Sequence, residues 1–292
     1  MSRSSLKVTP WQSRIKGAAL EGGAASISRL MKIKTFVIGY VLALALFLFA
    51  QRHTDAAQPA GFRAIVDLTH TVNAKAPTFD VSEKPVYQVK TVATIEKNKY
   101  FLRNICLPEH FGTHIDAPAH FAKGTWTVDQ IPPERLIAPL VVLDVTANVK
   151  NNPDYQISVE DIARWEQGNG QIPPGAVVIT RTGWDSRWDS ATNYRNADVK
   201  GVMHFPGYSE DAAKFLVEAR NVLGLGIDTL SIDYGPSKDF AVHQYTLAHS
   251  LYHLENVANL DRAPAHGAIV VVAPMKLEGG SGGPVRIFAL VR

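Results

Sequence analysis

The chain of 292 residues has little of several features that define common protein classes. Cysteine occurs once, at position 106, so no disulfide can form within the chain. The uncharged apolar run at residues 35–50 is shorter than the roughly 20 residues that a membrane-spanning helix needs. Stability must therefore come from burial of an apolar core, which a hydrophobic content of 46% can supply.

A basic stripe of the kind that binds nucleic acid is also missing. Residues 1–56 hold eight basic and two acidic residues of the 30 and 27 in the chain. That leaves 22 basic and 25 acidic residues in 57–292, a net charge of −3. We therefore expect no nucleic-acid partner for the main domain.

The N-terminal segment has the pattern of a targeting sequence. The basic stretch MKIK is followed by the apolar run at residues 35–50 and then by polar, Ala-rich sequence, which is typical of a secretory signal. An uncleaved membrane anchor through residues 35–50 is the alternative interpretation. We expect residues 1–56 to be an extension with a signal or anchor, and the protein to be exported to the periplasm or secreted.

Strand-like segments dominate residues 57–292. Some alternate between apolar and polar residues, and others, such as APLVVLDVT and GAVVITRTG, are continuous apolar runs typical of buried strands. The predicted strands are 64–72, 85–95, 99–107, 138–146, 175–183, 222–233, 267–277 and 285–292. With helices between some of them, the pattern indicates one α/β domain with a mixed, largely buried sheet flanked by helices.

Two helices are indicated by their N-terminal residues. Ser158 followed three residues later by Asp161 predicts a helix over residues 158–169, with Gly168 near its end. Ser209 is the expected N-cap of a second helix over residues 209–222.

The stretch EHFGTHIDAPAHF concentrates side chains that bind metals. Neutral imidazole and carboxylate groups are ligands that zinc or manganese accept, and His110, His114 and Asp116 fall within seven residues. Gly112 argues against a regular helix here, so we expect a bent loop or a strand that leads into one. His120 could be a fourth ligand or a proton-transfer group beside the metal.

The same stretch resembles a known family. HFGTHIDAPAHF fits the pattern H-x-G-T-H-x-D-x-P-x-H of the metal-dependent cyclase superfamily, which includes bacterial kynurenine formamidases and isatin hydrolases. The resemblance continues through GTWTVDQIPPERL, VVITRTGW, FPGYSEDAAKFL, GLGIDTLSID and GGSGGPVRIFAL, and so covers residues 62–292. It implies a cyclase-like swivelling β/β/α fold, a small-molecule amide substrate and a homo-oligomer.

The resemblance also implies roles for individual residues. His110, His114 and Asp116 would hold a first metal ion, and His120 would donate and accept protons. His243 and Glu255 have the twelve-residue spacing of the family's second cluster. A glutamate at position 255 favours two ions, as in kynurenine formamidases, whereas isatin hydrolase carries an amide there and holds one.

Two other patterns have competing interpretations. His249 and His253 are spaced like half of a metalloprotease motif, but Ser250 replaces the glutamate that would act as base. Both histidines are better interpreted as residues on a helix surface or in the core. The segment GGSGG precedes a strand instead of opening a helix, so a turn near the site is favoured over a phosphate-binding loop.

Phe79 is a candidate substrate contact. It falls where kynurenine formamidases place an aromatic residue after a Pro-rich turn, but the Pro-Gly that follows in that pattern is missing here. A core phenylalanine is the competing interpretation.

The sequence therefore predicts a metal-dependent hydrolase of a small amide, with one or two Zn or Mn ions. The reaction would release formate from N-formylkynurenine, a step of tryptophan catabolism, or open a cyclic amide. Covalent catalysis by Cys106 is not expected, because that residue falls in an apolar strand-like segment. The alternative is an exported metal- or ligand-binding protein that keeps the scaffold without turnover.

Overall fold

The computed structural model describes residues 61–79 and 86–292. The expected extension at residues 1–56, with its apolar run at 35–50, lies outside these residues. Within the two described ranges, none of the helices combines the length and the apolar character needed to cross a bilayer.

The centre of the fold is one mixed sheet of eight strands that closes on itself. Its order is β1-β12-β11-β5-β7-β9-β10-β4, and β4 pairs in turn with β12. The middle strands β5, β7, β9 and β10 run parallel to their neighbours in this series, and the other pairs are antiparallel. The strands are β1 (Ala64–Asp67), β4 (His114–Asp116), β5 (Ile137–Asp144), β7 (Val177–Arg181), β9 (Gly224–Ile227), β10 (Tyr252–Glu255), β11 (Ala268–Pro274) and β12 (Gly282–Val291).

The central strand β5 is buried on both faces. Leu140 and Val142 point into the core inside the closed sheet, whereas Val141 and Leu143 point into a second core under the helices. Alternate residues of a strand face opposite sides, so two cores need an unbroken apolar run. The interpretation of APLVVLDVT as a buried strand is confirmed, and so is the α/β class with a mixed sheet flanked by helices.

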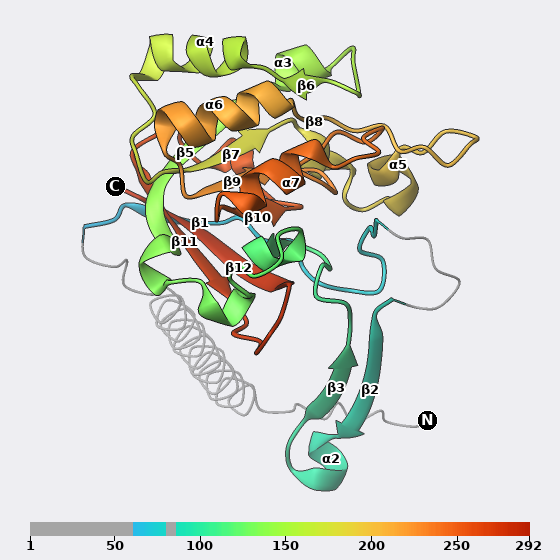
Figure 1. The fold of residues 1–292 in the computed structure, drawn as a ribbon. Coiled ribbons are helices and arrows are strands. Elements are labelled where there is room, and N and C mark those ends of the chain that lie inside the picture. Colours follow the sequence, from blue (N-terminus) through green and yellow to red (C-terminus); the bar gives the residue numbers. More distant parts are fainter. Residues whose placement is uncertain (1–60, 80–85) are drawn as a thin grey trace, which may run out of the picture. The chain divides into compact units, whose positions relative to one another are not determined.

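Helices α4 (Val159–Asn169) and α6 (Glu210–Arg220) lie over one side of this sheet, with α7 (Ala241–Ala248) beside α6 (Figure 1). The predicted starts are confirmed: Ser158 accepts from the backbone N–H of Asp161 in a capping box, and Ser209 caps α6. The predicted end at residue 169 is confirmed: Gly168 lies in the last turn of α4, and Gly170, with a φ of +86°, follows Asn169 as the C-cap.

The shorter helices lie in the connections between these elements. The α-helices are α2 (Ile95–Asn98), α3 (Thr146–Val149) and α5 (Ala191–Arg195). The 3₁₀ turns are η2 (Pro118–His120), η3 (Val128–Gln130), η4 (Pro133–Arg135), η5 (Trp184–Arg187) and η6 (Leu260–Arg262). A two-stranded parallel sheet joins β6 (Gln156–Ile157) to β8 (Gly207–Tyr208).

A hairpin of β2 (Gln88–Ala93) and β3 (Leu102–Cys106), joined through α2, extends away from the sheet (Figure 1). Its residues are largely exposed, including Cys106, which is the last residue of β3, within the strand predicted over residues 99–107. The hairpin carries seven exposed large hydrophobic residues: Val89, Val92, Ile95, Tyr100, Phe101, Leu102 and Ile105.

Candidate metal centre

Two paired strands place four of the candidate side chains on one face. In the antiparallel pair of β4 and β10, Asp116 lies opposite His253 and His114 lies opposite Glu255. Residues directly opposite in such a pair share a face, and alternate residues along a strand do too. Ile115 and Leu254 therefore point the other way, into the core inside the closed sheet. The tetrad of His114, Asp116, His253 and Glu255 is thus a product of strand register.

His114 is held by the turn that precedes it. Gly112 has a φ of +68°, a conformation that glycine adopts without strain, and its carbonyl accepts a 2.9 Å hydrogen bond from Nδ1 of His114. Because Nδ1 carries that hydrogen, Nε2 presents its lone pair to the centre. This nitrogen is 3.3 Å from Oδ1 of Asp116 and 3.4 Å from Oε2 of Glu255.

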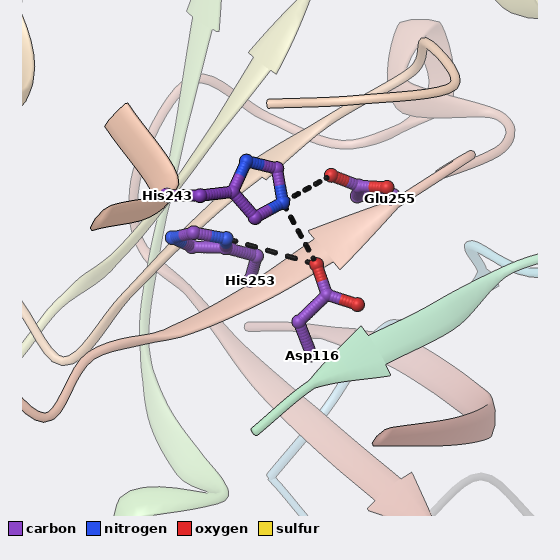
Figure 2. A group of neighbouring side chains, drawn as sticks. All are labelled: Asp116, His243, His253 and Glu255. Carbon is purple, nitrogen blue, oxygen red and sulfur yellow. Dashed lines mark ion pairs between the residues drawn. The ribbon is translucent and has the colours of Figure 1, made fainter. Parts of the chain in front are cut away.

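His243 reaches the centre from the first turn of α7. Its Nδ1 donates to Oδ2 of Asp233 at 2.6 Å, and Asp233 also accepts the backbone N–H groups of Val242 and His243. The buried Asp233 carboxylate thus caps α7 and orients the ring in one step. Nε2 of His243 then lies 3.4 Å from both Oδ2 of Asp116 and Oε1 of Glu255 (Figure 2).

His110 contacts Asp116 directly. Its Nδ1 is 2.6 Å from Oδ1 of Asp116, and its Nε2 is 2.9 Å from the hydroxyl of Ser281. Ser281 donates its own hydrogen to Glu109 at 2.6 Å, so its oxygen accepts from His110. The distances resemble those of a Ser–His–Asp triad, but the hydroxyl hydrogen points to Glu109 and not to the imidazole.

The buried carboxylates of Asp116 and Glu255 carry negative charge, which positive charge at this centre must balance. Burial alone would lower the pKa of His114, but Asp116 and Glu255 outweigh it and raise that pKa to about 10. Against its own burial, Asp116 has its pKa held well below the usual range by His114 and His110. Such a charge balance is met either by protons on the imidazoles or by divalent cations.

The distances between the ligand atoms, and one buried Asp116 oxygen without a partner in the described part of the chain, agree with bound cations. Charge-assisted hydrogen bonds measure about 2.7–2.9 Å, shorter than the 3.3–3.4 Å contacts of His114 and His243. Two ligands about 2.1 Å from one tetrahedral ion lie roughly 3.4 Å apart, which matches. Oδ2 of Asp116 is buried and has no hydrogen-bond partner among the described residues. An ion next to Oδ1 would also take the place of the proton shared with His110.

Two groups of ligands meet at Asp116. One contains Asp116, His243, His253 and Glu255, and the other contains His110, Asp116 and His120. Oδ1 of Asp116 faces His110 and His114, whereas Oδ2 faces His243 and His253. A carboxylate that offers one oxygen to each group is suited to bridge two ions.

His120 lies at the end of the η2 turn, above these groups. Its ring stacks on His110 with centroids 3.9 Å apart and meets His243 edge-on at 6.0 Å. Burial lowers the pKa of His120 to about 4, so the ring is neutral at neutral pH. Both roles considered for this residue, ligand and proton-transfer group, are within its reach.

A cavity of about 450 Å³ opens onto the centre. It is lined by His110, His120, His243 and Glu255 together with three phenylalanines, Phe79, Phe121 and Phe240. Phe240 has a φ of +52°, a conformation that is strained for a bulky side chain, immediately before α7. Phe79 is among the residues that line the cavity, and its role as a substrate contact stays a prediction.

Sequence reasoning missed four of the residues described here. His253 was interpreted as sharing a helix with His249, but α7 ends at Ala248 and His253 lies in β10. His249 is exposed, as expected. Asp233, Glu109 and Ser281 were not proposed, although each lies inside a quoted motif: Asp233 ends GLGIDTLSID, Glu109 begins EHFGTHIDAPAHF and Ser281 is the central residue of GGSGG.

Comparisons with known proteins agree with this geometry. The family model described as Putative cyclase matches residues 66–234, more than half of the chain. Isatin hydrolase of Roseibium aggregatum is 32% identical over 242 residues, which cover 78% of this chain and 91% of that protein. Kynurenine formamidase of Paracidovorax citrulli is 28% identical over 228 residues, covering 77% and 95%.

Comparison with a solved structure shows that the similarity extends to the three-dimensional fold. Isatin hydrolase A from Ralstonia solanacearum superimposes with a TM-score of 0.74 at 34% identity, over 86% of this chain and 97% of that one. These relatives are hydrolases, so the alternative of a binding protein without turnover is not favoured. The family resemblance of the HFGTHIDAPAHF motif is confirmed, and the chain belongs to the putative cyclase family.

Proposed function

We propose that this protein is a metal-dependent amidohydrolase that cleaves a small aromatic amide, with two divalent ions, zinc or manganese, at the centre around Asp116. The observation that carries the proposal is the arrangement of Asp116, whose two oxygens face two separate groups of imidazoles. His110 and His114 would hold one ion, His243 and Glu255 the other, and Asp116 both.

The ions would supply Lewis acidity that polarises the amide carbonyl and lowers the pKa of a water molecule. His120 is placed to move the protons. Its neutral ring accepts a proton from the water as the water oxygen joins the carbonyl carbon. The same ring then gives the proton to the nitrogen as the C–N bond breaks. The products are a carboxylic acid and an amine, and the acid then releases its proton to solvent as the carboxylate forms.

The substrate class follows from the walls of the cavity. Phe79, Phe121 and Phe240 form an apolar patch in the cavity, with ring centroids 5.7–6.1 Å apart between neighbours, and the Phe121 ring lies 4.7 Å from that of His243. A planar aromatic ring would pack on this patch while the amide next to it reaches the centre. Isatin, which one relative's name contains, and N-formylkynurenine, the formamide expected from the family resemblance, both combine an aromatic ring with an amide.

Two further proposals concern the whole protein. The exposed apolar side chains of the β2–β3 hairpin, such as Ile95 at 63% and Phe101 at 59% exposure, support a homo-oligomer in which this arm is covered by a second copy. The pattern of residues 31–56 supports export, with membrane association only if the apolar run at 35–50 is not removed. Light scattering and cell fractionation with intact-mass analysis test these two proposals.

The function is tested by turnover with each ion and each substrate. The purified protein is stripped of metal, reloaded with Zn²⁺ or Mn²⁺, and assayed with N-formylkynurenine and isatin. We expect ion-dependent hydrolysis of at least one of them, and loss of both ions and activity in Asp116→Ala. Full ion content without turnover of any aromatic amide would contradict the proposal.

A further inference from the structure

We infer that His253 is a metal ligand that completes a closed, four-ligand site with Asp116, His243 and Glu255, so that the two ions of this centre do different jobs. The inference rests on the proposed function, since it requires a metal-dependent centre. His253 lies outside the sequence motifs that predicted the other ligands, and its role follows from its contacts.

Thr246 fixes which nitrogen of His253 carries hydrogen. The Thr246 hydroxyl donates to the carbonyl of Val242 at 2.6 Å, and its oxygen is 2.6 Å from Nε2 of His253. A hydroxyl has a single hydrogen, so Nε2 of His253 must be the donor in the second contact. Nδ1 of the neutral ring therefore presents a lone pair.

The lone pair on Nδ1 of His253 faces a lone pair on Oδ2 of Asp116. Nδ1 of His253 lies 3.7 Å from Oδ2 of Asp116, and neither atom has a hydrogen-bond partner among the described residues (Figure 2). The separation is too long for a hydrogen bond, and too short for a bridging water, which needs roughly 4.5 Å between the two groups. A cation fits, because it attracts both acceptors at once and needs ligands roughly 3.4 Å apart.

The same position is suited to two more ligands. Nε2 of His243 is 3.4 Å from Oδ2 of Asp116 and 3.4 Å from Oε1 of Glu255. Oε1 of Glu255 also accepts from the backbone N–H of Ile232 at 2.8 Å, which fixes its carboxylate. The four side chains are held by neighbours on their outer sides, as ligands of a pre-organised metal site are.

The two groups of ligands differ in accessibility. His253 is fully buried and is absent from the cavity lining, whereas Asp116, His243 and Glu255 line the cavity with exposed fractions of 1%, 4% and 5%. Of the outer ligands, His114 is 4% exposed and the side chain of His110 is 26% exposed. Four protein ligands fill a tetrahedral ion, and three leave a position open. The inner ion, with His253 among its ligands, would therefore stabilise the fold and balance the charge of the centre. The outer ion at His110 and His114 would be the one that meets substrate.

Two substitutions separate ligation from structure. His253→Gln can place an amide N–H near Thr246 but has no ligand atom where Nδ1 was. His253→Asn places an amide oxygen where Nδ1 was but cannot reach Thr246. His249→Ala is the matched control, since His249 is exposed and four residues away.

The measurement is metal content by mass spectrometry and calorimetry, after loading with Zn²⁺ and again after dialysis against a chelator. We expect the wild type and His249→Ala to load two ions and keep one after dialysis. His253→Gln should keep none, with a loss of affinity beyond the roughly 10–100-fold that an outer partner costs. The metal retained by His253→Asn should lie between the amounts retained by the wild type and by His253→Gln.

Other outcomes overturn the inference in distinguishable ways. Unchanged retention in His253→Gln would make His253 a structural residue and leave the hydrolase intact. A wild type that loads one ion would remove the second site but not the function, whereas one that loads none would remove both. If the variants fail to fold, one-bond coupling between ¹¹³Cd and Nδ1 of His253 in the wild type decides, and its absence overturns the inference.

Discussion

Glu255 lies directly across from His114 in the antiparallel pair of β4 and β10, with its Oε2 3.4 Å from Nε2 of His114. On the other face of the pair, Ile115 and Leu254 are fully buried in the core. A slip of one residue would exchange the two faces. The packing of Ile115 and Leu254 therefore sets the register that brings the ligands together.

Glu255→Gln tests the charge at that position. The amide keeps the size of the side chain and one oxygen acceptor but removes a negative charge from a buried centre. We expect the affinity for the inner ion to fall while the outer ion stays bound, as measured by metal stoichiometry. Glu278→Gln, at an exposed position, is the control. Two ions bound with unchanged affinity in Glu255→Gln would show that the carboxylate is not a ligand.

His120→Ala separates proton transfer from metal binding. His110, His114 and Asp116 remain in this variant, so we expect the ions to stay bound. Loss of a general acid–base group should lower kcat by about 10²–10⁴-fold, with a smaller change in KM. Metal content and steady-state rates are measured on the same preparation. If the variant loses its ions, His120 is a ligand first; if it keeps ions and full rate, another group moves the proton.

Phe79→Leu tests the aromatic wall. Its ring lies 6.1 Å from that of Phe240 and is 39% exposed, so the substitution should leave stability nearly unchanged. An aromatic contact is worth about 0.5–1.5 kcal/mol, which predicts a rise in KM of roughly 2–10-fold for an aromatic amide. An aliphatic formamide should show no such rise. Equal effects on both substrates would remove Phe79 from the substrate site.

Glu166→Gln tests the junction of α4 with α6. Arg220 binds both carboxylate oxygens of Glu166 at 2.6 and 2.8 Å, and this contact lowers the pKa of Glu166 below 4.5. A carboxyl with a lowered folded-state pKa stabilises the protein above its unfolded-state pKa and loses this effect as pH falls through the folded value. At neutral pH we expect the variant to lose about 1–2 kcal/mol of unfolding free energy.

Urea unfolding at several pH values measures this difference. The gap between the wild type and Glu166→Gln should narrow as the pH falls from about 4.5. Glu160→Gln, exposed on the same helix, should differ from the wild type by a few tenths of a kcal/mol at most. A gap that is constant with pH would mean that ionisation of Glu166 contributes nothing.

The sequence was informative where one residue decides local geometry. Ser158 and Ser209 predicted two helix starts, because a side-chain oxygen at the N-cap binds a free backbone N–H wherever it occurs. Gly112 suggested a bent loop or a strand in place of a helix, and the chain turns at Gly112 and continues as β4. Unbroken apolar runs predicted strands buried on both faces.

His253 could not be assigned from the sequence, for a physical reason. A spacing of four residues from His249 is compatible with one helix face, and neither proline nor glycine interrupts the segment. The chain instead turns at Ser250, which adopts a φ of +61°, and continues as β10. Only pairing with β4, more than a hundred residues earlier, gives His253 its place. Asp233 and Thr246, which orient the rings of His243 and His253 by hydrogen bonds, also depend on this tertiary arrangement.

The closure of the sheet by β12 on β4 has a consequence for biosynthesis. A Cβ atom at Gly282 would lie 2.4 Å from the carbonyl oxygen of Ile115, so the two backbones meet too closely for any side chain between them. The adjoining Ser281 orients His110. The position of His110 therefore depends on the pairing of β12 with β4. We expect the ligands to reach their final arrangement only after β12 has been synthesised and has paired with β4.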